Sequence, residues 1–254
     1  MTVDFDVREH VGILTIDRPE ARNAVNGDVA QGIEAGIDRL EESEDLWVGI
    51  LTGNGPVFSA GADLKAINSG RAGELMTERG GFAGLVERQR TKPLIAAVDG
   101  PALAGGTEIT LACDLIVAST AAQFGIPEVK RSLVAAGAAL FRLPRVLPPK
   151  IAMELGLTGD PITPEVAHAH GMVNVLCEPG EALDKASELA GRICANAPVA
   201  VRETRRLMLE LVHADDKTGI EESNRAMGTV MATEDFNEGL TAFIEKRPPE
   251  WKGR

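Results

Sequence analysis

The sequence predicts an α/β fold that ends in a helical part. Short β-like runs alternate with stretches of helical periodicity as far as Pro179, and no further β-like run follows the "GMVNVLC" segment. Hydrophobic residues make up 44% of the 254-residue chain, which suits a globular protein with a sizeable core. Alternating strands and helices require crossover connections, so at least part of the sheet should be parallel.

The chain begins with a predicted hairpin and a helix. Val3, Phe5 and Val7 alternate with polar residues, and the run "VGILTI" follows after a short polar break. This pattern is typical of two paired strands. A helical period then extends from Val29 to Leu40.

The remaining elements follow in order. The β-like runs are "WVGILTG", "KPLIAAVDG", "DLIVAS" and "GMVNVLC", with a helix expected from Gly106 to Cys113. Later helices are expected over 182–194, 199–212 and 219–244. We divide the chain into a β/α core, residues 1–195, and a helical part, residues 196–254. Because no low-complexity linker separates them, the helical part should pack on the core or on a neighbouring subunit.

Composition narrows the classes of partner. The formal charge of −12 argues against nucleic acid or an anionic membrane. The three cysteines form no CxxC pair and the four histidines no ligand grouping, so we expect neither a metal site nor a disulfide framework. This favours a reducing, cytoplasmic location. The N-terminus lacks a signal-peptide pattern, and no apolar run approaches the roughly 18 residues of a membrane span.

Two segments repeat one plan. "VGILTGNGPVFSAGADL" and "LIAAVDGPALAGGTEIT" each pass from a β-like run through a corner of small residues to the expected start of a helix. Free backbone N–H groups with a partial positive charge collect at helix starts. Brought together, two such corners would form a site for a negatively charged oxygen.

Glu108 is the first candidate for catalysis, because it is expected in the first turn of the helix after Gly105 and Gly106. Side chains on a helix lean toward its N-terminus, which would point this carboxylate at the loop. The positive helix end favours the ionised form, as a general base requires. On position alone, an acid that only caps the helix is the commoner explanation.

Glu128 is the second candidate. Phe124 and Pro127 should make its surroundings apolar, and loss of hydration raises the pKa of a carboxyl group. A carboxyl that keeps its proton near neutral pH can act as an acid, so Glu108 and Glu128 together fit a division between base and acid. Taken alone, Glu128 fits a surface carboxylate after a proline turn.

Two other motifs are incomplete. "VFSAG" places Ser59 near the GxSxG elbow of serine hydrolases, but Val57 occupies the first glycine position and no Asp/His partner is evident. "GNGPVF" begins like a GxGxxG dinucleotide motif but ends in Phe58. A serine nucleophile and a dinucleotide site are therefore disfavoured.

Segments along essentially the whole chain resemble the enoyl-CoA hydratase/isomerase (crotonase) superfamily. They are "RPEARNAVN", "FSAGADL", "GPALAGGTEITLACDLIVAS", "AQFGIPEV", "LTGDPIT" with "AHAHGMVNVL", and the terminal "FIEKRPPEWKGR". Their combination is specific, although no single segment is. The resemblance implies a crotonase-like spiral of ββα units, with C-terminal helices that build homotrimers, often paired into hexamers.

The same resemblance implies a site for an acyl-CoA thioester. The N–H groups of Ala62 and Gly105 would form the oxyanion hole, and Glu108 and Glu128 fall on the positions of the two catalytic glutamates of the hydratases. Having both favours addition of water to a 2-trans-enoyl-CoA, giving a 3-hydroxyacyl-CoA. In this reaction Glu108 activates the water and Glu128 protonates the α-carbon. No metal or redox cofactor is implied, since CoA is part of the substrate.

Other residues match CoA contacts of the family. Arg22 is placed to meet a phosphate, and Phe243 and Lys246 match residues that reach the CoA of an adjacent subunit. The stretches that line the adenine and pantetheine contribute Ala24, Ala60, Asp63, Leu64 and Lys65.

The chain also departs from the family pattern, because alanine or serine replaces residues that hydratases commonly carry as glycine or proline. The replacements are Ala104, Ser132, Ala135, Ala138 and Ala139. Alanine restricts positive φ angles, so the helix after Glu128 and the acyl pocket that it lines are expected to differ. We expect an enoyl-CoA hydratase, and the sequence does not specify the acyl group of its substrate. The alternatives are an enoyl-CoA isomerase, a carnitinyl-CoA dehydratase, or a catalytically silent acyl-CoA-binding protein.

Overall fold

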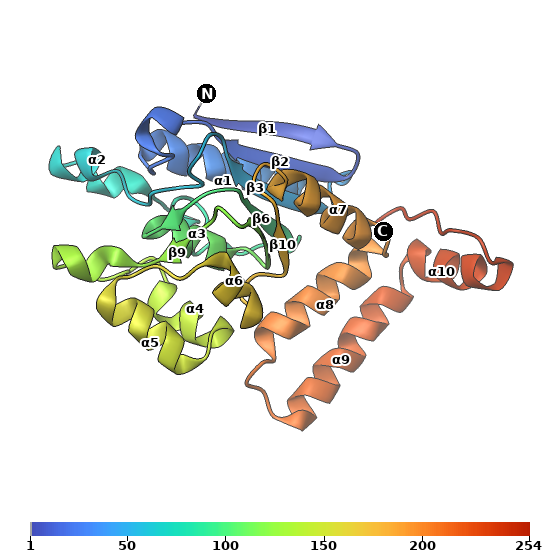
Figure 1. The fold of residues 1–254 in the computed structure, drawn as a ribbon. Helices are drawn as coiled ribbons and strands as arrows, with labels where there is room; N and C mark the ends of the chain where they lie inside the picture. Colours follow the sequence, from blue (N-terminus) through green and yellow to red (C-terminus); the bar gives the residue numbers. More distant parts are fainter. Residues whose placement is uncertain (1) are drawn as a thin grey trace.

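The computed structural model describes residues 2–254 and has a six-stranded sheet at its centre (Figure 1). β1 and β2 form the predicted antiparallel hairpin, whereas every other neighbouring pair in this sheet is parallel. The prediction of an α/β fold with a partly parallel sheet is therefore confirmed. The strand order is β1 (Val3–Arg8), β2 (Val11–Ile16), β3 (Val48–Gly53), β6 (Leu94–Val98), β8 (Leu115–Ser119) and β10 (Val175–Cys177).

Short pairings join successive turns of the chain beyond the central sheet. β4 (Met76–Thr77) pairs with β5 (Gly81–Phe82), and β7 (Ala102–Leu103) pairs with β9 (Phe124–Gly125). Isolated bridges add further links, from Val25 to Ala62, Ser59 to Ala102 and Phe124 to Ile162. The segments that follow β2, β3, β6 and β8 are thereby fixed to one another, and these segments carry most of the predicted site residues.

Helices surround the sheet, and α8, α9 and α10 stand to one side of it (Figure 1). The α-helices are α1 (Gly27–Glu42), α2 (Leu64–Asn68), α3 (Gly105–Ala112), α4 (Ala139–Val146), α5 (Pro149–Thr158), α6 (Pro164–Ala169), α7 (Ala182–Cys194), α8 (Pro198–Glu210), α9 (Asp216–Met231) and α10 (Glu234–Glu245). Three 3₁₀ helices join them: η1 (Pro19–Ala21), η2 (Ala72–Leu75) and η3 (Pro127–Arg131).

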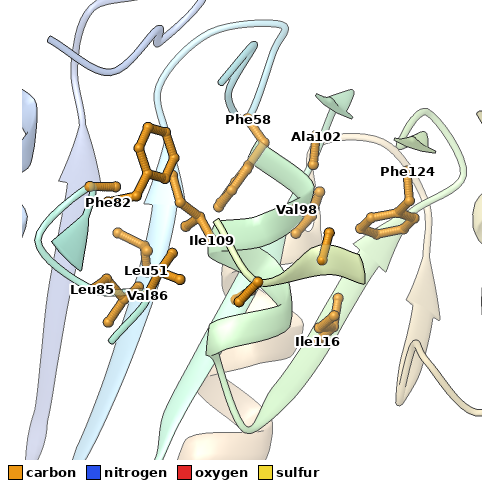
Figure 2. Close-up of a cluster of buried hydrophobic side chains, with 14 of the residues drawn as sticks. Leu51, Phe58, Phe82, Leu85, Val86, Val98, Ala102, Ile109, Ile116 and Phe124 are labelled. Atoms are coloured by element: carbon orange, nitrogen blue, oxygen red, sulfur yellow. The ribbon is translucent and has the colours of Figure 1, made fainter. Parts of the chain in front are cut away.

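Each face of the sheet has its own hydrophobic core, because successive strand residues point to opposite faces. Ile95 and Ala97 of β6 join the core under α7, where alanines at helical spacing contact the sheet. The other face carries the larger core, which includes Phe58, Ile109 and Phe124 (Figure 2). Ile109 directly follows Glu108 on α3, so this core fixes the helix on which Glu108 stands.

The helical part departs from the prediction at one point. The periodicity predicts one helix over 219–244, but the chain forms α9 and α10 with a break at Ala232 and Thr233. Thr233 is extended (φ −84°, ψ 155°), and its hydroxyl accepts a hydrogen bond from Phe236 N (3.1 Å). The continuous periodicity hides this helix-capping threonine, which starts a new helix.

Residues 248–254, which we call the C-terminal strap, pack against the helical part. Asp235, at the start of α10, accepts hydrogen bonds from the backbone N–H groups of Lys252 (2.7 Å) and Gly253 (2.8 Å). Trp251 donates from its indole to Ala195 O (2.9 Å), beside the end of α7. The predicted boundary at residue 195 coincides with this helix end, although the division into two parts and the trimer stay predictions. Within the described residues, no helix is long and apolar enough to cross a membrane.

Candidate active site

The structure brings the two small-residue corners into contact. Leu103 N donates to Ser59 O (3.0 Å), and a Cβ on Gly61 would lie 2.5 Å from Gly105 N. A Cβ on Gly106 would overlap Ser59 O. The contact between the corners therefore requires residues without side chains, which explains the glycines at both corners.

The N–H groups of Ala62 and Gly105 at this contact have no protein acceptor within residues 2–254. By contrast, Asp63 N donates to Val25 O (2.9 Å) and Ala104 N donates to Gly125 O (2.8 Å). Gly105 is the first residue of α3, where the helix itself leaves the N–H free and the helix dipole is positive. The predicted oxyanion-hole donors are thus free and near each other, and their role stays a prediction.

Three residues that replace family glycines keep positive φ angles. Ala104, just before α3, has φ 52° and ψ −126°, and Ser132 and Ala138 have φ 57° and 84°. The backbone therefore keeps this conformation at these positions although a Cβ restricts it. Surrounding hydrogen bonds hold it there, as from Glu108 N to Ala104 O (3.3 Å) and from Arg142 N to Ala138 O (3.1 Å). The shape of the acyl pocket stays a prediction.

Glu108 stands in the first turn of α3, as predicted, and only 4% of it is exposed. Its Oε1 accepts a hydrogen bond from Ala139 N (3.2 Å) at the start of α4, whereas no side chain caps the start of α3, so the capping explanation does not hold. Burial raises its pKa to about 7, because loss of hydration outweighs the hydrogen bond and the charge of Glu128 adds to the rise. The sequence indicated that the helix end favours the ionised form of Glu108, but burial dominates and raises the pKa, so the carboxyl can exchange its proton near neutral pH.

Glu128 lies in η3, three residues after the end of β9, whose Phe124 and Gly125 are buried. Its Oε2 is buried without a hydrogen-bond partner, so a solvated surface carboxylate does not describe it. Burial raises the pKa of Glu128, and its own backbone N–H and Arg131 oppose that rise. Since its charge also raises the pKa of Glu108, the two carboxyl groups lie close enough to interact.

Most of the predicted CoA contacts lie on two adjacent segments. Ala60 N donates to Arg22 O (3.0 Å), and Val25 N donates to Gly61 O (2.7 Å), so residues 22–25 run beside residues 60–63. The predicted contact residues on these segments are exposed at Arg22, Leu64 and Lys65, half-buried at Ala60, and buried at Ala24 and Asp63.

Asp63 already has protein partners. Its carboxylate pairs with Arg18 (2.7 Å) and caps α2 by accepting from Lys65 N (2.9 Å). Burial tends to raise its pKa, but these hydrogen bonds lower it overall. The carboxylate therefore has a structural role, and the contacts of both segments with CoA stay predictions.

Phe243 and Lys246 are not brought to this site within one chain. They lie at the end of α10, on the opposite side of the molecule from α2 (Figure 1). Phe243 is 85% exposed, an unusual state for a large apolar side chain. The predicted contact with the CoA of an adjacent subunit depends on an oligomer and stays a prediction.

Sequence reasoning missed Asn23, which organises the first corner. It is fully buried with φ 53°. Its Oδ1 accepts from Arg18 N (2.9 Å), and its Nδ2 donates to Asn54 O (2.8 Å) and Val57 O (2.7 Å). The available signal was the asparagine of "RNAVN" after a proline turn, since asparagine tolerates the left-handed region.

Thr107 organises the second corner. Its hydroxyl accepts a hydrogen bond from Gly125 N (3.0 Å) and lies 2.7 Å from Ala102 O, to which it can donate. It therefore ties the start of α3 to β7 and β9. Nothing in the sequence distinguishes it from an ordinary helix threonine.

Ser59 is fully buried, and its hydroxyl donates to Asn23 O (2.8 Å). This hydroxyl supports the first corner, in line with the incomplete GxSxG motif, which disfavours a serine nucleophile. No group of three or more His, Cys, Asp or Glu side chains suited to a metal ion occurs in the part of the chain that the structure describes.

A family model described as enoyl-CoA hydratase/isomerase matches residues 6–254. The chain belongs to this family. The crotonase fold is supported by an enoyl-CoA hydratase structure from Mycobacterium tuberculosis H37Rv, which is 49% identical with a TM-score of 0.96 and covers 100% of this chain and 99% of that chain. The resemblance seen in the sequence is therefore confirmed.

Curated relatives of this crotonase include hydratases and dehydratases. A carnitinyl-CoA dehydratase of Salmonella arizonae is 40% identical, with 94% of each chain covered. A mevalonyl-coenzyme A hydratase of Aspergillus fumigatus is 38% identical, with 96% of this chain and 92% of that protein covered. These relatives support hydratase or dehydratase chemistry, whereas their names differ in the acyl group.

Proposed function

We propose that this crotonase is an enoyl-CoA hydratase, which adds water reversibly to a 2-trans-enoyl-CoA to give a 3-hydroxyacyl-CoA. The observation that carries the proposal is the interacting pair of carboxyl groups of the buried Glu108 and the half-buried Glu128, on segments adjoining the free N–H groups of Ala62 and Gly105. A carboxyl group with a pKa of about 7 next to a second carboxyl group with a raised pKa suits proton transfer, and free backbone donors suit a developing oxyanion.

The two N–H groups would bind the thioester carbonyl. When water adds to the β-carbon, the electrons of the double bond move toward the α-carbon and the thioester oxygen. Fixed donors stabilise this enolate-like state without rearranging, and loss of one such donor typically costs about 3 kcal/mol. The contact between Gly61 and Gly105 keeps the two donors in a fixed relation.

The glutamates would move the protons. Ionised Glu108 takes a proton from water as its oxygen bonds to the β-carbon, and neutral Glu128 gives a proton to the α-carbon. Dehydration of the product uses the reverse transfers. Because the pKa of Glu108 is raised to about 7, this group can gain and lose a proton near neutral pH, and the raised pKa of Glu128 favours its protonated form. CoA serves as part of the substrate, and the reaction itself requires no separate cofactor.

The CoA portion would lie along residues 22–25 and 60–65. Arg22 would meet a phosphate, and Phe243 and Lys246 of an adjacent subunit would complete the site in a homotrimer or hexamer. The exposed apolar surface of α10 supports an assembly. We place the enzyme in the cytoplasm because its cysteine pattern suits a reducing compartment.

The proposal does not specify the acyl group of the substrate. The relative named as a carnitinyl-CoA dehydratase favours a second candidate, dehydration of a carnitinyl-CoA, which needs the same oxyanion site and carboxyl pair. An isomerase would instead move the double bond without adding water, and a silent binding protein would do neither.

The test is the ultraviolet absorbance of the conjugated enoyl thioester. Wild type, Glu108→Gln and Glu128→Gln would be assayed with short, long, branched and cationic 2-enoyl-CoAs. The proposal expects absorbance loss and a 3-hydroxy product with wild type, and a large loss of rate in both variants. Tight binding without hydration of any substrate would contradict it, and double-bond migration in 3-enoyl-CoAs would then favour an isomerase.

A further inference from the structure

The carboxylate of Glu108, which belongs to α3, contacts the start of a second helix, α4. Ala139 N, the first N–H of the eight-residue helix α4, donates to its Oε1 (3.2 Å). The other oxygen, Oε2, lies where a Cβ on residue 137 would be, and only the missing side chain of Gly137 leaves room for it. Both oxygens are thus in contact with the chain just before α4.

The start of α4 is itself firmly held. Leu143 anchors the helix in the larger core, and Arg142 donates from Nη2 to Val86 O (2.8 Å). Ala138, with φ 84°, turns the chain so that the N–H of Ala139 faces Glu108. A donor on a packed helix keeps one position, unlike a donor on a mobile surface loop.

We infer that residues 137–139 form a seat for the Glu108 carboxylate, and that Gly137 is a positioning residue for the proton transfer described above. The inference rests on the proposed function of Glu108. A carboxylate in this seat has one oxygen hydrogen-bonded and the other packed against a bare backbone. A methyl group at position 137 would occupy the place of Oε2 and displace the carboxylate.

The seat also affects the charge of Glu108. The N–H of Ala139 stabilises the ionised form and opposes the rise of pKa caused by burial. Loss of this hydrogen bond should therefore raise the pKa of Glu108 above about 7. A pH profile can detect this effect, which a general loss of folding would not produce.

The test is Gly137→Ala, with Gly156→Ala as the matched control. Gly137 has no positive φ, so alanine fits its backbone and meets mainly the carboxylate. A Cβ on Gly156, in α5, would meet Ile126 at an ordinary 3.7 Å. We expect Gly137→Ala to lower kcat by about 100-fold, the cost of misplacing a reacting group by roughly 1 Å, with little change in KM. The acidic limb of its pH–rate profile should move to higher pH, while Gly156→Ala retains wild-type kinetics.

A double mutant separates this inference from the proposed function. If Glu108→Gln abolishes hydration and Gly137→Ala has no further effect in that background, the two residues act as one unit. Unchanged kcat and pH profile in a folded Gly137→Ala protein would overturn the seat alone. Full activity of Glu108→Gln would instead overturn the role of Glu108 in the proposed function.

Discussion

The start of α3 and the 3₁₀ helix η3 each present a carboxyl group with at least one buried oxygen, but they hold it differently. Glu108 of α3 has a hydrogen-bond partner on a second, well-packed helix. Glu128 of η3 has a buried oxygen without any partner in the described chain. A buried polar atom without a partner is costly, so Glu128 suits contact with a ligand or retention of its proton. This difference fits the proposed roles, in which Glu108 of α3 is a held base and Glu128 of η3 is an acid available to the substrate.

The strongest test of this comparison is removal of each carboxyl group. Glu108→Gln and Glu128→Gln should each lower kcat by roughly 10²–10⁴-fold, the usual contribution of general acid–base catalysis. Binding of a saturated acyl-CoA, measured by calorimetry, should change little because the N–H groups remain. A normal rate in either variant would remove that residue from the mechanism.

The second test concerns how the free energy of unfolding depends on pH. Glu108 in the folded chain has a pKa of about 7 against an ordinary 4.5, so the folded state keeps a proton that the unfolded chain has lost. This group therefore stabilises the fold below pH 4.5, and that stabilisation is lost as pH rises to about 7. The loss amounts to about 3 kcal/mol at 1.36 kcal/mol per pKa unit.

Urea denaturation at several pH values measures this effect. Glu108→Gln should flatten the decline in the free energy of unfolding between pH 4.5 and pH 8, whereas the exposed control Glu154→Gln should not. Equal pH dependence in wild type and Glu108→Gln would show that burial does not raise the pKa of Glu108.

A change remote from both carboxyl groups separates binding from chemistry. Deletion of residues 248–254 removes the backbone donors to Asp235 and should loosen α10, which carries Phe243. We expect weaker acyl-CoA binding and weaker assembly, with the pH dependence of the residual activity unchanged. Affinity and sedimentation equal to those of wild type would exclude a role of the strap in presenting Phe243 and Lys246.

The smallest expected effect concerns the backbone of the Glu108 seat. Ala138 has φ 84°, where glycine has no steric penalty, so Ala138→Gly should relieve strain of about 1 kcal/mol. For a chain of this size, that gain corresponds to a rise in Tm of about 2–4 °C, partly offset by greater freedom of the unfolded chain. Ala136→Gly, at a neighbouring position without positive φ, is the control and should not raise Tm. A lower Tm for Ala138→Gly would show that the alanine is not strained.

Much of the fold could be predicted from local pattern. The hairpin, the strands and the helix of Glu108 agree with the alternation of apolar residues, because each element shows its own period in the sequence. The break between α9 and α10 could not be read in this way, since Thr233 interrupts no apolar period. Asn23 and Thr107 were missed because their partners lie on other turns of the chain.

The sequence by itself determined the chemical types of the site: two bare corners, Glu108 just after the second corner, and Glu128 after Pro127 further along the chain. It did so because glycine and carboxylate have properties that do not depend on the fold. Only the tertiary structure decided the state of the acids. Burial of Glu108 raises its pKa and Ala139 holds its carboxylate, whereas Glu128 is left with an unpartnered oxygen. Hydration and hydrogen bonding depend on the residues that surround a group in space, and those residues are distant in the sequence.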